Sequence, residues 1–205
     1  MSDKRKVHEK ILNVLNDISE RFADIAEINR REAQHVDHQS IINELEKSET
    51  DLEDFEKHIE GFEKAIEQHE SGNQTITDEE EQVELLNVAR TAMWLSEEYC
   101  ELIKDLGREA VENRDEQEAR LSLRYLRDLN EVLKSVEELC KMIDDKNFEK
   151  NSQTIKENLK GAEFRPSDLN EEREGIKEEW REISQLMTAN GLVDSKEDLD
   201  SGKIR

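Results

Sequence analysis

A heptad pattern runs without a break through residues 38–69. Its seam positions recur every third and fourth residue, and almost every residue between them is charged or carries an amide. The seam consists of His38, Ile41, Leu45, Ser48, Leu52, Phe55, Ile59, Phe62, Ile66 and His69. Two seam positions in seven make a narrow stripe, which is the surface that one helix presents to one partner helix. The pattern therefore predicts a long helix with a coiled-coil seam.

The composition is typical of a chain built from long helices. The 205 residues include one proline and seven glycines, and 40% of them are charged. A mean hydropathy of −0.97 and a net charge of −23 argue against a single large core. No segment approaches the roughly 18–20 apolar residues that a membrane-spanning helix needs. Cys100 and Cys140 have no CxxC spacing, which is typical of reduced, packed thiols. We expect a soluble cytoplasmic protein, and a nuclear location is compatible with the same features.

The first two predicted segments are joined by a change of phase. Residues 1–36 predict an amphipathic helix, because their apolar side chains follow the helical period. This stripe falls out of phase with the next seam at residues 29–37, where we expect a stutter, a kink or a short loop. Residues 37–70 form the acidic coiled-coil helix. The stretch Ser71–Thr75 predicts a turn that returns the chain antiparallel.

Residues 77–146 predict a second long helix or a pair of helices. The region contains two apolar seams. One consists of Leu85, Val88, Ala92, Leu95, Tyr99, Leu102 and Leu106, and the other of Leu126, Leu129, Leu133, Val136, Cys140 and Ile143. Between them, residues 112–118 are all polar or charged and include neither glycine nor proline. We therefore expect the helix to continue through this stretch.

Residues 147–193 predict short helices that pack back on the others, with a weak helical piece at 154–159. Pro166 favours a helix start, and Asn190-Gly191 favours its end. The apolar face of this helix is Leu169, Ile176, Trp180, Ile183 and Met187. The polar residues 194–205 predict a disordered tail. The whole pattern predicts an all-α fold, an elongated antiparallel helical hairpin or bundle with coiled-coil seams, a short C-terminal helix and a disordered tail.

This architecture favours a non-enzymatic scaffold, adaptor or assembly subunit that acts through protein contacts. The seam can join chains into a homo-oligomer, or it can pack within one chain. The residues expected to carry association are Leu45, Leu52, Phe55, Ile59, Phe62 and Ile66. Trp94 lies off the apolar seam of its helix. It either packs inside the bundle or anchors a partner, because tryptophan is enriched in interface hot spots.

The acidic helix is a second candidate partner surface. Residues 37–81 contain sixteen acids and three lysines, a net charge of −13. Such a run is either a solvated face or a docking surface for a basic protein, whose approach it would steer. The residues proposed for this surface are Glu56, Glu60 and Glu63.

Two other functions remain open. A strongly acidic helical protein can imitate the charge of DNA and inhibit a nucleic-acid-binding protein. Separately, Glu80-Glu81-x-x-Glu84 followed by Glu112-x-x-Asp115 resembles the paired acidic motifs of the MazG-type nucleotide pyrophosphohydrolases. The resemblance implies an all-α enzyme whose carboxylates hold magnesium, which prefers oxygen ligands. We rank it third, because such spacings recur easily among 53 acids in 205 residues.

No cofactor, metal or catalytic residue is predicted from the remaining motifs. His35 and His38 are spaced to share a transition metal, but the sequence offers no third ligand nearby. Arg120, Arg124 and Arg127 form a small basic cluster that we expect to pair with neighbouring acids. We therefore expect a protein partner, no direct contact with nucleic acid and no membrane insertion.

Overall fold

Five helices form the described part of the protein. The computed structural model describes residues 3–33, 39–71, 78–141, 166–194 and 199. The helices are α1 (Asp3–Ala33), α2 (Gln39–Ser71), α3 (Asp78–Glu112), α4 (Glu116–Lys141) and α6 (Pro166–Ala189). These residues include no strand, so the predicted all-α fold is confirmed. The helical piece predicted at 154–159 lies outside the described residues.

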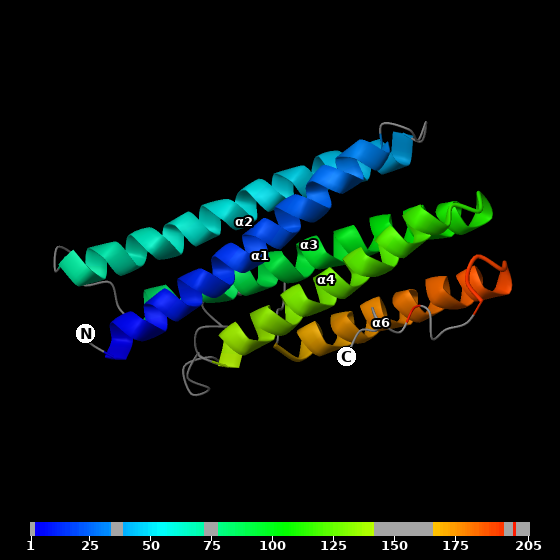
Figure 1. Cartoon of the computed structure of the whole chain (residues 1–205). Helices are drawn as coiled ribbons and strands as arrows, with labels where there is room; N and C mark the ends of the chain where they lie inside the picture. The colour runs from blue at the N-terminus through cyan, green and yellow to red at the C-terminus, as the bar shows by residue number, and fades with distance from the viewer. Residues whose placement is uncertain (1–2, 34–38, 72–77, 142–165, 195–198, 200–205) are drawn as a thin grey trace.

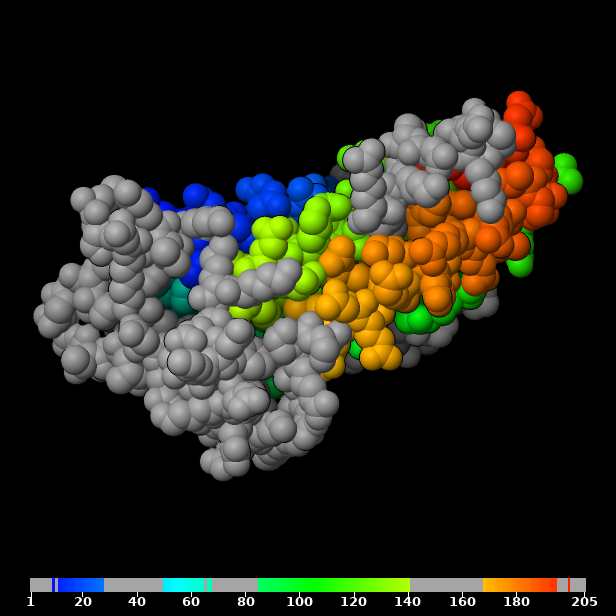
Figure 2. Space-filling view, turned by 90° about the horizontal axis from the view of Figure 1, so that it is seen from below, coloured from blue at the N-terminus to red at the C-terminus, as the bar shows by residue number. Residues whose placement is uncertain are grey.

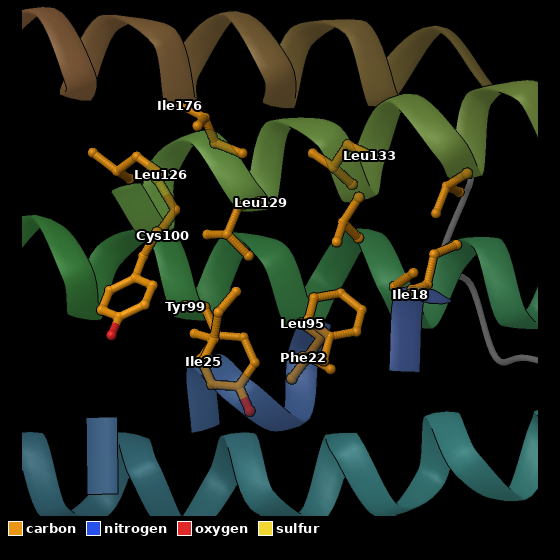
Figure 3. Close-up of a cluster of buried hydrophobic side chains, with 14 of the residues drawn as sticks. Ile18, Phe22, Ile25, Leu95, Tyr99, Cys100, Leu126, Leu129, Leu133 and Ile176 are labelled. Atoms are coloured by element: carbon orange, nitrogen blue, oxygen red, sulfur yellow. The ribbon is translucent and has the colours of Figure 1, made fainter. Parts of the chain in front are cut away.

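The helices alternate in direction along an elongated bundle. In Figure 1, α1, α3 and α6 run one way, and α2 and α4 run the other way. The α3–α4 pair lies in the middle, with α1 and α2 on one side and α6 on the other (Figures 1 and 3). The predicted pairing of the acidic helix α2 with α3 is present. None of the described helices is long and apolar enough to cross a membrane.

The described residues of the predicted seams are mostly buried inside this single chain. The seven positions of the α3 seam, which begins at Leu85 and ends at Leu106, are all buried. Aromatic contacts join three helices, because Phe22 of α1 packs edge to face with Phe55 of α2 at 5.4 Å and also contacts Tyr99 of α3 at 6.0 Å between ring centroids. Figure 3 shows apolar side chains from α1, α3, α4 and α6 that point toward one another. Whether the helices supercoil as coiled coils stays a prediction.

The predicted continuous helix through residues 112–118 is wrong. α3 ends at Glu112, and Arg114 adopts a left-handed conformation with φ of 59°. The amides of Arg114 and Asp115 donate to the carbonyls of Val111 and Ala110, at 3.1 and 2.8 Å. This is the Schellman arrangement that normally uses glycine. Asp115 then caps α4, because its carboxylate accepts from the amide of Glu118 at 3.1 Å.

The predicted end of the last helix is confirmed. Gly191 has φ of 69°, and the amides of Gly191 and Leu192 donate to the carbonyls of Thr188 and Met187. The predicted apolar face of this 24-residue helix is entirely buried. Within the stretch predicted to be a disordered tail, Leu199 is described, and it is buried against the core.

Candidate functional site

Only a narrow stripe of α3 reaches the surface. α3 packs against α1, α2, α4 and α6, so most of its circumference is covered. Between residues 85 and 111, the exposed side chains follow one another at spacings of three and four residues. They are Trp94, Glu97, Glu101, Asp105 and Glu109, and we call them the α3 stripe. A helix in the middle of the bundle thus presents one aromatic ring followed by four acids.

Trp94 is the anchor of the α3 stripe. It is 38% exposed and is the one exposed large hydrophobic side chain among the described residues. The sequence left two roles open for Trp94, packing inside the bundle or anchoring a partner, and placed Trp180 on the apolar face of the last helix. Trp180 is buried on α6, whereas Trp94 offers its ring to solvent.

A buried arginine lies beneath the exposed ring. The guanidinium carbon of Arg90 is 4.6 Å from the ring centroid of Trp94, and Arg90 is only 7% exposed. Its Nε has no hydrogen-bond partner among the described residues. Burial lowers the pKa of Arg90. The π-face of Trp94 is a favourable electrostatic contact for this cation, worth about 0.5–2 kcal/mol in such geometries.

Acids of α3 and α6 come together one turn beyond Trp94. Glu172 of α6 is half-buried and faces Glu97 and Glu101 of the α3 stripe. Burial, followed by repulsion from these like charges and from Glu171, raises the pKa of Glu172 to about 7. Lys104 of α3 is paired with Glu101, at 2.7 Å between Nζ and Oε2.

The predicted acidic surface lies on a different helix. Glu56 and Glu60 of α2 are exposed, and Glu63 is half-buried. Lys64 Nζ lies 3.2 Å from Glu60 Oε2, so that part of the negative charge is balanced locally. Trp94 belongs to α3, so the predicted partner-surface residues are distributed over two neighbouring helices.

The predicted association residues are mostly enclosed within the chain. Phe55, Ile59, Phe62 and Ile66 are between 0 and 6% exposed, and Leu52 packs half-buried against the core. The side chain of Leu45 falls outside those that the structure describes. These contacts are intramolecular, which is the alternative that the sequence left open. Association between chains stays a prediction.

Two of the acids of the hydrolase resemblance lie far apart along one helix. Glu84 and Glu112 both belong to α3 and are 28 residues apart (112 − 84), which is about 42 Å at 1.5 Å per residue. Among the described residues, no group of three His, Cys, Asp or Glu side chains is placed to hold a metal ion. The His35 and His38 pair lies outside the described residues.

The basic cluster of α4 pairs with acids, as predicted. Arg120 Nε lies 2.7 Å from Glu116 Oε1, and Arg124 and Arg127 lie 3.9 and 3.8 Å from the carboxylate of Asp128. These pairs connect residues of the same helix. Three arginines share two acids, so the positive charge of the cluster is partly balanced locally.

No protein-family model, curated protein or solved structure matches the chain. Residue roles consequently rest on exposure, charge and geometry. By these criteria the sequence located Trp94 but missed Arg90 and Glu172. The spacing of four residues between Arg90 and Trp94 was visible as a candidate cation–π pair. The neighbours of Glu172 depend on which helix α6 packs against, and no local sequence pattern predicts that packing.

Proposed function

We propose that this chain is a non-enzymatic helical adaptor or scaffold subunit that binds a protein partner through the α3 stripe. The exposure of Trp94 carries the proposal. In a bundle that encloses its other described large apolar side chains, this ring alone remains available as a hot-spot anchor. A buried cation beneath the ring and acids one turn away give it a defined electrostatic setting.

The partner that fits this surface is a basic segment of a protein. Glu97, Glu101 and Asp105 continue the stripe beyond Trp94, and the chain as a whole carries a net charge of −23. A lysine or arginine of the partner can stack on the free face of Trp94 while it approaches these carboxylates. The net charge would also speed the encounter, to an extent that falls with salt.

The burial of the seam supports a monomer as the binding unit. With Phe55, Ile59, Phe62 and Ile66 enclosed, joining two chains through them would require the bundle to open. The free, buried thiols of Cys100 and Cys140 suit a reducing intracellular compartment, in line with a cytoplasmic location.

Site-specific photo-crosslinking tests the proposal. A photoreactive phenylalanine analogue replaces Trp94 in the full chain, and a matched variant carries it at Gln117, an exposed residue at the start of α4. Both are irradiated in extract of the native cells at low and high salt. We expect one protein adduct at position 94, with a basic segment at the crosslinked site and a yield that falls with salt. Charge reversal by Glu97→Lys and Glu101→Lys should remove the adduct.

Equal labelling from positions 94 and 117, or no adduct from either, would overturn the proposed surface. The captured protein also decides between the adaptor and the DNA-mimic alternative. If it binds nucleic acid, and if a DNA duplex displaces this chain from it, the inhibitor function is favoured. If DNA has no effect, the adaptor function stands.

A further inference from the structure

The contact between α3 and α6 has two ends with opposite charge patterns. Toward the C-terminal ends of the two helices, bases of α3 meet acids of α6. Arg108 Nη2 lies 2.9 Å from Glu182 Oε1 and 3.3 Å from Glu179 Oε2, and Lys104 Nζ lies 3.6 Å from Glu179 Oε1. Because α3 and α6 run in the same direction (Figure 1), these pairs hold the later turns of α6 against the later turns of α3.

The N-terminal half of α6 meets α3 with like charges instead. Because α3 and α6 run in the same direction and Lys104 meets Glu179, the residues seven positions earlier, Glu97 and Glu172, lie on the same side of this interface. Glu101 and the neutral thiol of Cys100 lie one turn further along α3, and Glu171 is adjacent on α6. Among the described residues, no lysine or arginine pairs with Glu172. This end of α6 therefore meets an acidic surface with a carboxyl that is half removed from water.

On the side of α6 that faces α4, Arg173 is paired with polar groups of α4. Arg173 Nη1 donates to Glu137 Oε2 at 2.7 Å, and its Nε donates to Asn130 Oδ1 at 3.3 Å. The next residue along α6 from Glu172 is thus engaged on the other side of the helix. Figure 2 shows α6 at the surface of the molecule, where it lies along α4. A loosening of α6 would begin on the α3 side, where charge is unmatched.

Protonation removes this mismatch. The pKa of Glu172 is raised to about 7 from its ordinary value of 4.5, first by burial and then by the neighbouring acids. The docked helix therefore holds the proton more tightly than an undocked helix does. Docking weakens as the pH rises from about 4.5 to about 7 and changes little above that range.

We propose that the N-terminal half of α6 is a pH-dependent latch on α3, closed while Glu172 carries a proton and loosened when this carboxyl ionises. Glu97 and Glu101 belong to the α3 stripe, so the latch borders the surface on which Trp94 lies. Its use as a regulator of partner binding rests on the proposed function. The latch itself is a property of the isolated chain.

Amide hydrogen exchange of the full chain at pH 6 and pH 8, corrected for the intrinsic pH dependence of exchange, tests the latch. Protection of α6 is read relative to α4, which serves as the internal reference. We expect the equilibrium constant for the opening of α6 to increase by a few-fold to about tenfold from pH 6 to pH 8. Glu172→Gln keeps the size of the side chain without its charge. In this variant the protection of α6 should be the same at pH 6 and pH 8. Glu178→Gln, an exposed position on the same helix, should behave as the unmodified chain.

Two results would overturn the latch: equal protection of α6 at both pH values in the unmodified chain, or a pH dependence that persists in Glu172→Gln. Circular dichroism checks that this variant is folded. Because exchange is measured without a partner, failure of the latch leaves the crosslinking result at Trp94 untouched. Failure of crosslinking likewise leaves the exchange result untouched.

Discussion

The guanidinium carbon of Arg90 lies 4.6 Å from the centre of the Trp94 ring, one helical turn away on α3. One face of the ring therefore contributes to stability, because it packs against a cation that is only 7% exposed to solvent. Trp94 itself is 38% exposed to solvent. Stability and binding can therefore be separated at Trp94, which is unusual for a large aromatic residue in a small bundle.

The two tryptophans should differ sharply in their contribution to stability. Trp94→Ala loses a partly exposed cation–π contact, so we expect the free energy of unfolding to fall by about 1 kcal/mol. Trp180→Ala removes a buried ring from the α6 interface and should cost about 3–5 kcal/mol. Urea unfolding followed by circular dichroism measures both. A loss at Trp94 as large as that at Trp180 would mean that Trp94 is a core residue.

Two helical glycines should respond to alanine in opposite directions. A Cβ at Gly107 would lie 2.7 Å from Ile183 Cδ1 and 3.1 Å from Ser122 Cβ, where α3, α4 and α6 meet. Gly107→Ala should therefore destabilise the protein by about 1 kcal/mol, after the gain in helix propensity is subtracted.

Gly175→Ala is the matched control, because nothing lies within 4 Å of its added Cβ. This exposed helical position should gain about 0.5–1 kcal/mol. Thermal unfolding of the two variants compares them directly. Stabilisation by both substitutions would show that the three helices meet less closely at Gly107.

The turn between α3 and α4 carries a correctable strain. Arg114 has φ of 59°, which costs a side-chain-bearing residue about 1 kcal/mol, so Arg114→Gly should stabilise the protein by up to about 1 kcal/mol. Asp115→Ala removes the cap of α4 and should destabilise it by about 1 kcal/mol. Equilibrium unfolding in urea gives both values. If glycine at position 114 destabilises the chain, the left-handed turn is not the native one.

The two thiols should be nearly inert in the folded protein. Burial raises the pKa of both Cys100 and Cys140 to about 12 from 9.0, which leaves about a thousandfold less thiolate near neutral pH. An aromatic disulfide reagent should label neither thiol at pH 8 until denaturant is added, and then label both. Rapid labelling of one thiol in the native protein would place that cysteine at the surface.

The sequence predicted the helices well because their burial repeats with the helical period. The α3 seam and the apolar face of α6 are buried residue for residue. The turn at Arg114 was missed because helix ends are usually recognised by glycine. The available signal was Asp115-x-x-Glu118, which has the spacing of a capping box.

The candidate site was only half predictable. Trp94 stood out because it falls off the apolar seam of its own helix. Glu172 did not, because its pKa is raised first by burial and then by acids more than seventy residues earlier in the chain, and both depend on the packing of α6. Tertiary placement, and not local pattern, decides which of many similar acids becomes unusual.

We propose that the apolar seam closes within one chain and leaves Trp94 as the surface for a partner. Light scattering on a sizing column tests this proposal, with the unmodified chain and Trp94→Ala at low and high salt. We predict a molar mass of 24.0 kDa for both proteins at both salt concentrations. A multiple of that mass that persists in Trp94→Ala would contradict the claim, because the seam would then be joining chains.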